Sequence, residues 1–568
     1  MVSKKIRITG AQLSFPVGAI QQNKQTILDA IEVGEQNQSD IVVFPELALT
    51  GYPPEDLLLR ESFVGKNFAV LEEISEFTTS TSAIVGFVDR TMAKHKIDMT
   101  TRSIANAAAI VQNGDVKGIY HKSFLPNYSV FDEARYFSAG NDAGKLFWYE
   151  GIGIGISICE DIWIEDGPAE QQAKNGASLI ININASPFDT SKSKARKENV
   201  IAKAKKLKIP ILYLNTVGGQ DELVFDGGSF LVNGEGELQY QANQFKEEIF
   251  HFDLELKPIE NYPTSSLQIR EKIQEIDFDT NYIQLDKYEE IYAALKLGLS
   301  DYVQKNKFQK VLVGLSGGID SALTAAIAVD AIGEKNVIGV AMPSKFNSSE
   351  SLEDAQILAE NLGIEFKIIE IEDIVESLRN KIMENISEDL SAVTDENLQS
   401  RVRGNLLMAL SNQTGAMVVS TGNKSEMAVG YSTLYGDLAG GFAVLKDLYK
   451  TEVYKLSKFR NSISHVIPEN TITKEPSAEL RPDQLDTDSL PEYELLDKIL
   501  YMYIEQDASS EKIISSGIKK EIVYDVLAKV DRNEYKRKQV SPGVKLTGKA
   551  FGKDRRMPIT NTYIRDEI

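Results

Sequence analysis

The chain has 568 residues, of which 42% are hydrophobic and 26% are charged. This length exceeds what one hydrophobic core normally holds, so we expect two ordered domains of a few hundred residues each. The formal net charge of −21 argues against nucleic acid as the main partner, because basic surfaces bind backbone phosphates.

Short β-branched runs alternate with longer helical patterns over residues 1–257, which predicts an α/β domain. The expected strands cover residues 41–44, 83–88, 107–111, 151–158, 178–183 and 210–215. A basic run at residues 192–208 mixes charged and small apolar residues, so it indicates a solvated helix face rather than a polyanion site.

Residues 258–286 are polar and contain prolines, and they show no regular alternation of strand and helix patterns. We interpret them as a linker. A second α/β domain is expected over residues 287–568, with a strand at residues 310–315, a glycine-rich turn and a helix from about Asp320. Residues 336–343 and 416–421 have the apolar character of further parallel strands that are buried on both faces.

No stretch approaches the ~20 continuous apolar residues of a membrane span, and the N-terminus lacks the apolar core of a signal peptide. We therefore expect a cytoplasmic protein without membrane contact. Cys159 is the single cysteine of the chain and cannot form an internal disulfide. It is therefore either a buried core residue or a reactive group that takes part in chemistry.

Cys159 ends the segment GIGIGISIC, in which isoleucines alternate with small residues. Because side chains alternate along a strand, the thiol would lie on the uncrowded face at a strand end. Glu160 and Asp161 follow directly and should disfavour the thiolate. A nucleophilic Cys159 therefore needs a base or a cation from elsewhere in the chain.

Two other residues that follow strand-like segments could activate such a thiol. Glu46 lies in VVFPELALTG, where partial desolvation would make a carboxylate a usable base. Lys122 lies in YHKSFLPNY and could supply a positive charge, and His121 beside it is an alternative partner for the cysteine. Residues of these types are more often surface or core positions, so their spacing alone does not decide the matter.

The motifs FPELALTGYPPEDLL, HKSFLPNYSVFDEARYF, ISICEDIW and NINASPF together resemble the nitrilase-like carbon-nitrogen hydrolase superfamily. A fifth motif, YLNTVGGQDELVFDGGS, is similar to the amidase half of the glutamine-dependent NAD synthetases. The resemblance implies an α-β-β-α sandwich in which Glu46 is the general base, Lys122 the cation near the oxyanion and Cys159 the nucleophile. Glu160 and Asp161 would then be scaffold residues. The resemblance further implies three residues that hold L-glutamine, namely Tyr128, Ser186 and Lys192.

The segment GLSGGIDS, residues 314–321, follows a strand and opens a helix, so its backbone N–H groups form an anion site. It is not a Walker A loop, because no lysine follows the glycines. The segment resembles the PP-loop pyrophosphatase family, which cleaves ATP between the α- and β-phosphates, and this implies a Rossmann-like PP-loop domain. The predicted ATP contacts are Gly314, Leu315, Ser316, Gly317, Gly318, Ile319, Asp320, Ser321 and Thr421. The carboxylates of Asp320 and Glu426 are the predicted Mg²⁺ ligands.

The segment ENLQSRVRGNLLMALSN predicts a helix with Leu398, Val402, Leu406 and Leu410 on one buried face. Asn397 and Arg401 share another face, where the arginine could bind a phosphate or make a surface salt bridge. This part of the chain resembles the NAD synthetase domain, which implies that deamido-NAD contacts Asn397, Glu426 and Lys536. Lys538 lies two residues away and is the alternative to Lys536.

The combined resemblance implies an enzyme that hydrolyses L-glutamine, activates deamido-NAD with ATP, and displaces AMP with the released ammonia. An enclosed path for ammonia is inferred from this pairing of activities. Two alternatives stay open: another PP-loop amidotransferase-synthetase that acts on a different carboxylate or carbonyl, and a binding protein without turnover. By the same resemblance we expect a homo-oligomer.

Overall fold

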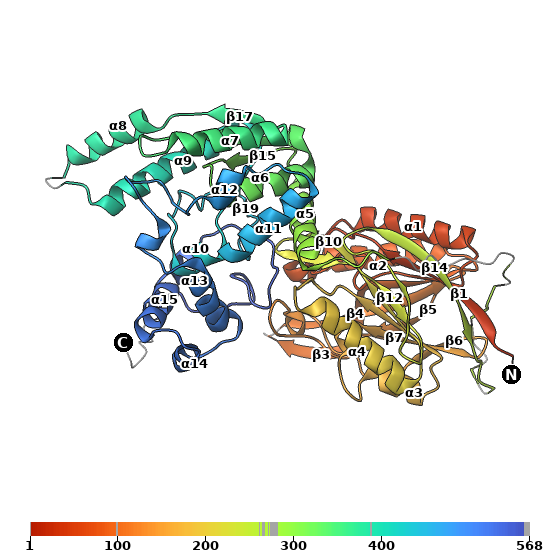
Figure 1. Ribbon diagram of the computed structural model, residues 1–568. Coiled ribbons are helices and arrows are strands. Elements are labelled where there is room, and N and C mark those ends of the chain that lie inside the picture. Colours follow the sequence, from red (N-terminus) through yellow and green to blue (C-terminus); the bar gives the residue numbers. More distant parts are fainter. Residues whose placement is uncertain are drawn as a thin grey trace. The chain divides into compact units, whose positions relative to one another are not determined.

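The computed structural model describes residues 2–97, 100–260, 262–263, 267–270, 272, 282–386 and 389–561. The chain forms two compact units, the first of Met1–Gln220 with Val224–Leu285 and the second of Asp221–Leu223 with Asp286–Ile568. Figure 1 labels many of the elements of both units. The domain limits expected from the sequence stay a prediction, and the expected linker at residues 258–286 falls partly outside the described residues.

The first unit contains a six-stranded sheet with the order β14-β1-β2-β3-β4-β5. Strands β1, β2 and β3 run parallel, whereas β14, β4 and β5 pair antiparallel with their neighbours. The bounds are β1 Lys4–Gln12, β2 Ile41–Val43, β3 Ser82–Ile97, β4 Thr100–Gln112, β5 Asp115–His121 and β14 Glu248–Leu256.

A second six-stranded sheet of this unit has the order β13-β12-β9-β8-β7-β6. Its central strands β7, β8 and β9 are parallel, with Ile158 opposite Ile183 and Asn184 opposite Asn215. The bounds are β6 Leu146–Tyr149, β7 Ile152–Ile158, β8 Leu179–Asn184, β9 Ile211–Asn215, β12 Phe230–Val232 and β13 Leu238–Gln241. A short hairpin joins β10 Val217–Gln220 to β11 Leu223–Asp226.

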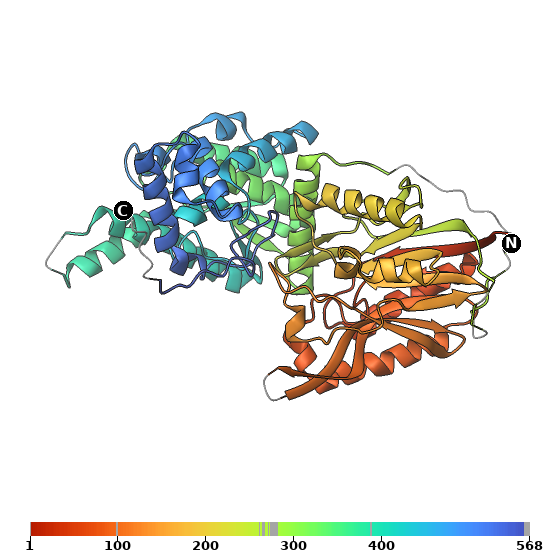
Figure 2. The same ribbon diagram turned by 90° about the horizontal axis from the view of Figure 1, so that it is seen from below.

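The two sheets pack face to face between two pairs of helices (Figures 1 and 2). Helices α1 Ile20–Gln36 and α2 Glu61–Phe77 cover the first sheet, and α3 Pro168–Lys174 and α4 Lys192–Leu207 cover the second. One apolar cluster joins the inner faces of both sheets, and one further cluster lies under each pair of helices. The predicted α-β-β-α sandwich is confirmed.

The basic run forms helix α4 as predicted, and Lys194 and Lys205 are exposed on it. The expectation of a solvated basic face is wrong for Arg196, which is buried. Its guanidinium donates to Asp226 Oδ1 over 3.0 Å. A buried charge needs such a partner because its desolvation is otherwise uncompensated.

The second unit contains a five-stranded parallel sheet with the order β17-β16-β15-β18-β19. The apolar runs predicted as buried strands form β15, β16 and β18, and the helix predicted from about Asp320 begins at Ile319. The strand bounds are β15 Val311–Gly314, β16 Val337–Ala341, β17 Glu365–Ile368, β18 Met417–Ser420 and β19 Phe442–Ala443.

Helices surround this sheet, and a second group of helices packs around its own apolar cluster in the C-terminal part. As predicted, Leu398, Val402, Leu406 and Leu410 pack against the core of the sheet. The helix bounds are α5 Lys287–Lys305, α6 Ile319–Ile332, α7 Ser349–Leu362, α8 Glu372–Met383, α9 Ala392–Thr414, α10 Lys424–Val429, α11 Lys450–Ile463, α12 Glu469–Thr473, α13 Tyr493–Leu500, α14 Ser510–Ser515, α15 Lys520–Arg532 and α16 Glu534–Arg537. Within the described part of the chain, no helix combines the length and apolarity that crossing a membrane requires.

Candidate active sites

The predicted base and cation of the first unit meet at one end of its first sheet. Glu46 follows β2 and Lys122 follows β5, and the Lys122 ammonium donates to Glu46 Oε1 over 2.7 Å. Both side chains are buried. The loop that carries Glu46 passes close over the neighbouring strand, because a Cβ atom at Gly86 would lie 2.2 Å from the Pro45 carbonyl oxygen. Glycine at this position therefore lets the loop approach.

Two residues that the sequence analysis missed complete this cluster. Glu133, in the 3₁₀ turn Glu133–Arg135, accepts a second hydrogen bond from Lys122 over 2.8 Å and another from the Tyr52 hydroxyl. Asn106 of β4 donates to Glu46 Oε1 over 2.6 Å. Lys122 is thus held between two carboxylates.

Cys159 lies directly after β7, as predicted, and is the first residue of the 3₁₀ turn Cys159–Ile162. Its φ is +44°, in the left-handed region that residues with a Cβ rarely adopt. Such strained backbone is concentrated at functional sites, where the surrounding structure holds it in place. Cys159 is 4% exposed and is therefore almost wholly buried.

The two carboxylates that follow the cysteine make structural contacts, as expected. Asp161 accepts hydrogen bonds from the backbone N–H groups of Ser123 and Phe124, over 3.0 and 2.9 Å. These two residues come directly after Lys122, so Asp161 ties the segment of the cation to the turn of the nucleophile. Glu160 accepts from the Tyr128 hydroxyl over 2.8 Å.

Burial governs the protonation of this cluster. It raises the pKa of the Cys159 thiol well above its ordinary value, Glu46 adds to the effect and Lys122 opposes it. Burial also raises the pKa of Glu133 to about 7, against the influence of Lys122. Although burial disfavours the charged ammonium, Glu133 and Glu46 outweigh it and hold the pKa of Lys122 well above its usual range. Lys122 therefore keeps its positive charge, whereas the Cys159 thiol stays protonated until a base takes its proton.

The residues predicted to hold glutamine come from two segments, one after β5 with Tyr128 and one from the end of β8 to the start of α4 with Ser186 and Lys192. Ser186 is held by Asn215, which accepts from the Ser186 N–H over 2.9 Å, and the preceding N–H, of Ala185, donates to Glu46 Oε2 over 3.0 Å. Tyr128 is half exposed. Lys192 is the first residue of α4, and its N–H donates to the Asp189 carbonyl.

In the second unit, the glycine-rich loop forms the expected turn between β15 and α6. Gly317 has a φ of +80°, and a Cβ atom there would lie 2.2 Å from the Ser351 carbonyl oxygen. The Gly318 N–H donates to Ser316 Oγ over 3.2 Å, and Ser321 Oγ donates to the Gly318 carbonyl over 2.9 Å. The two serines thus stabilise the conformation of the loop.

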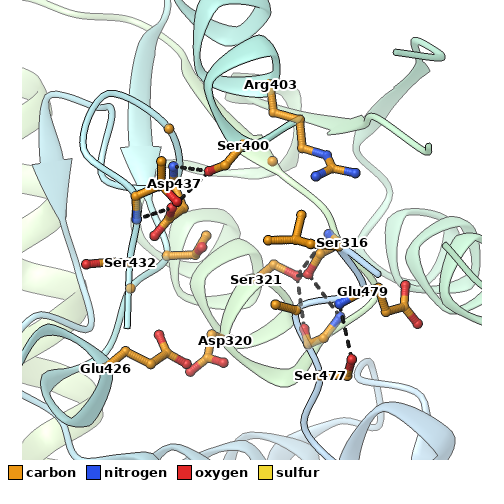
Figure 3. A pocket seen from close by; sticks show the side chains of 18 of the residues that line it. Ser316, Asp320, Ser321, Ser400, Arg403, Glu426, Ser432, Asp437, Ser477 and Glu479 are labelled. Atoms are coloured by element: carbon orange, nitrogen blue, oxygen red, sulfur yellow. Dashed lines mark hydrogen bonds between the residues drawn. The ribbon is translucent and has the colours of Figure 1, made fainter. Parts of the chain in front are cut away.

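This loop borders a cavity of about 480 Å³. Of the predicted ATP contacts, all but Gly317 line the cavity, and so do all three predicted deamido-NAD contacts. Figure 3 shows Asp320 and Glu426 pointing toward one another across part of this cavity. The sequence-predicted residues of the second unit therefore come together at one site.

Lys450, which the sequence analysis missed, connects the two predicted metal ligands. Its ammonium donates to Asp320 Oδ2 and, over 3.2 Å, to Glu426 Oε1. Burial raises the pKa of Glu426 to about 8, with Lys450 lowering it and Asp320 raising it. In the described ranges, no group of three acidic, histidine or cysteine side chains lies close enough together to hold a metal ion.

The predicted deamido-NAD contacts also have fixed positions. Asn397 Oδ1 accepts from the Thr433 hydroxyl over 2.7 Å. The Lys536 ammonium donates to the carbonyls of Gly430 and Ser432 over 2.7 and 2.8 Å, and burial lowers its pKa. Of the two alternatives at this position, Lys536 lines the cavity, whereas Lys538 pairs with Glu534.

The sequence suggested Arg401 as a possible phosphate ligand, but a different arginine of α9 lines the cavity. Arg401 is exposed, and its Nε donates to the Leu434 carbonyl over 3.3 Å. Arg403 lines the cavity instead, with hydrogen bonds to the Met342 carbonyl and Asn347 Oδ1, and burial lowers its pKa to about 10. Helical spacing from Asn397 does not single out Arg403, because Arg401, four residues on, lies nearer to the side of Asn397 than Arg403 does.

Comparison with known proteins agrees with both sites. The carbon-nitrogen hydrolase family model matches residues 7–264, and the NAD synthase model matches residues 291–540. The chain is 46% identical to a glutamine-dependent NAD(+) synthetase of Aquifex aeolicus and 45% identical to one of Thermotoga maritima, in each case over 99% of this chain and at least 99% of the relative. A solved glutamine-dependent NAD+ synthetase from Acinetobacter baumannii, in complex with ADP, is 41% identical over 98% of this chain and 99% of its own, with a TM-score of 0.74.

Proposed function

Because the chain belongs to the glutamine-dependent NAD(+) synthetase family, we propose that Cys159 hydrolyses L-glutamine and that the PP-loop cavity uses the released ammonia. The overall reaction converts deamido-NAD, ATP, L-glutamine and water into NAD, AMP, pyrophosphate and L-glutamate. The convergence of Glu46, Lys122 and Cys159 in one buried cluster, on a chain that also carries a lysine-free phosphate loop, is the observation that carries this proposal.

In the first half-reaction, Cys159 Sγ attacks the carbon of the glutamine carboxamide and its proton passes to Glu46. The oxyanion that forms is stabilised by the Lys122 ammonium, whose charge is secured by its two carboxylate partners. The carbon–nitrogen bond then breaks, the leaving nitrogen takes the proton from Glu46, and a thioester remains. Water, deprotonated by Glu46, hydrolyses the thioester to glutamate and restores the thiol.

Glutamine itself would be held by Tyr128, Ser186 and Lys192. The fixed backbone of Ser186, one residue from the N–H that binds Glu46, supports a role in placing the amide next to the base. Tyr128 and Lys192 remain predictions for the other end of the substrate.

In the second half-reaction, the nicotinate carboxylate of deamido-NAD attacks the α-phosphorus of ATP and the α–β bond breaks. The glycine-rich turn and the N-terminus of α6 would stabilise the departing pyrophosphate. Ammonia then attacks the activated carbonyl carbon, AMP leaves, and one proton is lost from the nitrogen. Asn397 and Lys536 would position deamido-NAD, and Arg403 would bind phosphate through the N–H groups that the protein leaves available at the cavity wall.

The carboxylates of Asp320 and Glu426 fit Mg²⁺, because both are hard oxygen donors and both converge on one cation, the Lys450 ammonium. Mg²⁺ is usually held by one or two carboxylates together with substrate phosphates, which agrees with a pair rather than a larger acidic cluster. When bound there, Mg²⁺ would neutralise charge that develops on the phosphates.

A single labelling experiment tests the assignment of the whole reaction. With glutamine labelled at the amide nitrogen, the label should appear in the carboxamide of NAD when ATP and deamido-NAD are present. Release of labelled ammonia without labelled NAD would contradict the synthetase assignment. Incorporation into another acceptor would favour a different amidotransferase.

The expected homo-oligomer and the cytoplasmic location stay predictions from the family resemblance. Light scattering on the purified full-length chain tests the first of these. Localisation of a tagged chain in cells tests the second.

A further inference from the structure

Asn106 lies fully buried at the centre of the glutaminase cluster, on a strand whose neighbouring positions are Ala105, Ala107 and Ala108. Its side chain donates to Glu46 Oε1 over 2.6 Å, and to Glu133 Oε2 at the longer distance of 3.5 Å. Its backbone carbonyl accepts from the Lys122 N–H over 2.8 Å. One residue therefore contacts the base, the cation and the second carboxylate.

The other polar atom of this amide is not satisfied. Among the described residues, Asn106 Oδ1 accepts no hydrogen bond although it is buried. An unpaired buried polar atom costs about 1–3 kcal/mol, and the strand otherwise carries small apolar residues. The amide cannot turn over to relieve this cost, because its oxygen would then face the carboxylate. The Asn106 carboxamide therefore leaves its oxygen unpaired while its NH₂ group donates to the carboxylates.

The donors around Glu46 determine which of its oxygens can act. A carboxylate oxygen has two lone pairs. Oε1 accepts from Lys122 and from Asn106, which occupies both of its lone pairs, whereas Oε2 accepts only the Ala185 N–H among the described residues. One lone pair, on Oε2, is left for the proton of Cys159.

We propose that Asn106 is a positioning residue of the glutaminase site, which fills the second lone pair of Glu46 Oε1 and makes Oε2 the atom that accepts the thiol proton. This inference rests on the proposed role of Glu46 as general base. It assigns to Asn106 an effect on proton transfer rather than on glutamine contact. The charged or titratable groups that face Glu46 are Lys122, Glu133, Tyr52 and Cys159.

The test compares Asn106→Ala and Asn106→Asp in the full-length enzyme with a matched control. Asn182→Ala removes another buried asparagine that also has an unpaired Oδ1, but whose amide donates to Ser157 Oγ and not to the base. Loss of a hydrogen bond to a charged group predicts a fall in glutamine hydrolysis of about 10- to 100-fold for Asn106→Ala. Ammonium-driven NAD synthesis by the same samples reports that the protein is intact.

The pH profile separates this role from simple support of the strand. Without the Asn106 donor the ionised carboxylate is less favoured, so the acidic limb of kcat/KM for glutamine should move to higher pH. Asn106→Asp keeps the volume and adds a like charge, so its limb should move further. Asn182→Ala should leave the limb in place.

Three outcomes overturn the proposal. Asn106 variants with the wild-type acidic limb, or a control variant with the same shift, would show that the amide only supports packing. If Asn106→Ala does not fold, the isosteric Asn106→Asp decides by the same criterion. If Glu46→Gln still hydrolyses glutamine, Glu46 is not the base, and the proposed role of Asn106 fails with it. If Glu46→Gln is inactive while the Asn106 variants behave like the wild type, only the role of Asn106 is refuted.

Discussion

Each unit contains a buried lysine between two carboxylates, but the surroundings differ. In the first unit, Lys122 and its partners Glu46 and Glu133 are sealed into the protein and are positioned before any substrate arrives. In the second unit, Lys450 holds Asp320 and Glu426 at the wall of a cavity of about 480 Å³. The comparison indicates that the first site depends on fixed proton donors and acceptors, whereas the second presents its carboxylates to a cavity that has room for a ligand.

The largest expected effect abolishes the activity of the first unit and spares that of the second. Cys159→Ala should reduce glutamine-driven NAD synthesis by several orders of magnitude, because no other cysteine exists to form the thioester. Ammonium-driven synthesis should stay close to the wild-type rate, since ammonia then enters without glutamine hydrolysis. Assays with each nitrogen source check this, and loss of both activities would contradict the division of labour.

Asp320→Asn is expected to impair NAD synthesis and to spare glutamine hydrolysis. Removing a proposed Mg²⁺ ligand from the cavity wall should lower NAD synthesis from either nitrogen source by about 10²-fold or more, because less Mg²⁺ would then be held there to neutralise charge on the phosphates. Glutamine hydrolysis, measured as glutamate release, should persist. An exposed aspartate, Asp488, supplies the control Asp488→Asn. A selective loss of glutaminase activity would argue against the assignment.

The arginines of α9 sharpen the comparison within the second unit. Arg403→Met should raise the KM for ATP by about tenfold, as expected for one lost charge-assisted contact to phosphate. Arg401→Met removes the exposed arginine two residues earlier and should leave this KM near wild type. Steady-state kinetics with ammonium as the nitrogen source measures both. Equal effects would place the phosphate contact elsewhere.

A smaller effect is expected for the two lysines of the C-terminal segment. Lys536→Met should raise the KM for deamido-NAD several-fold, because this ammonium lines the cavity. Lys538→Met should not, since that side chain pairs with Glu534. The same kinetic assay with varied deamido-NAD distinguishes them, and the reverse order would reassign the contact.

The last prediction concerns protonation and requires no loss of activity. Burial, supported by Glu46, raises the pKa of Cys159, so less thiolate is present at neutral pH than in an ordinary thiol. Alkylation by iodoacetamide should therefore be slower in the native enzyme than in the unfolded chain at pH 7–8, and its rate should still increase above pH 9. Mass spectrometry follows the single cysteine directly. A plateau of the native rate near pH 7 would indicate a thiolate already formed in the free enzyme.

The sequence by itself determined the features that depend on neighbouring residues. Alternating side chains placed Cys159 at a strand end, and the strand–glycine–helix order identified the phosphate loop, because periodicity and turn chemistry are local properties. The resemblance to known families then implied a set of residues that the structure brings to the wall of the second cavity.

Only the tertiary structure decided which distant groups meet. Lys122 and Glu46 are 76 positions apart, and Lys450 and Asp320 are 130 apart, so no local pattern shows that they pair. In the sequence, Asn106 is one polar residue in an alanine-rich segment. Its side chain reaches Glu46 only because β4, β5 and the loop that carries Glu46 pack together. Arg403 replaced Arg401 at the cavity for the same reason, because the packing of α9 fixes which side of the helix faces the site.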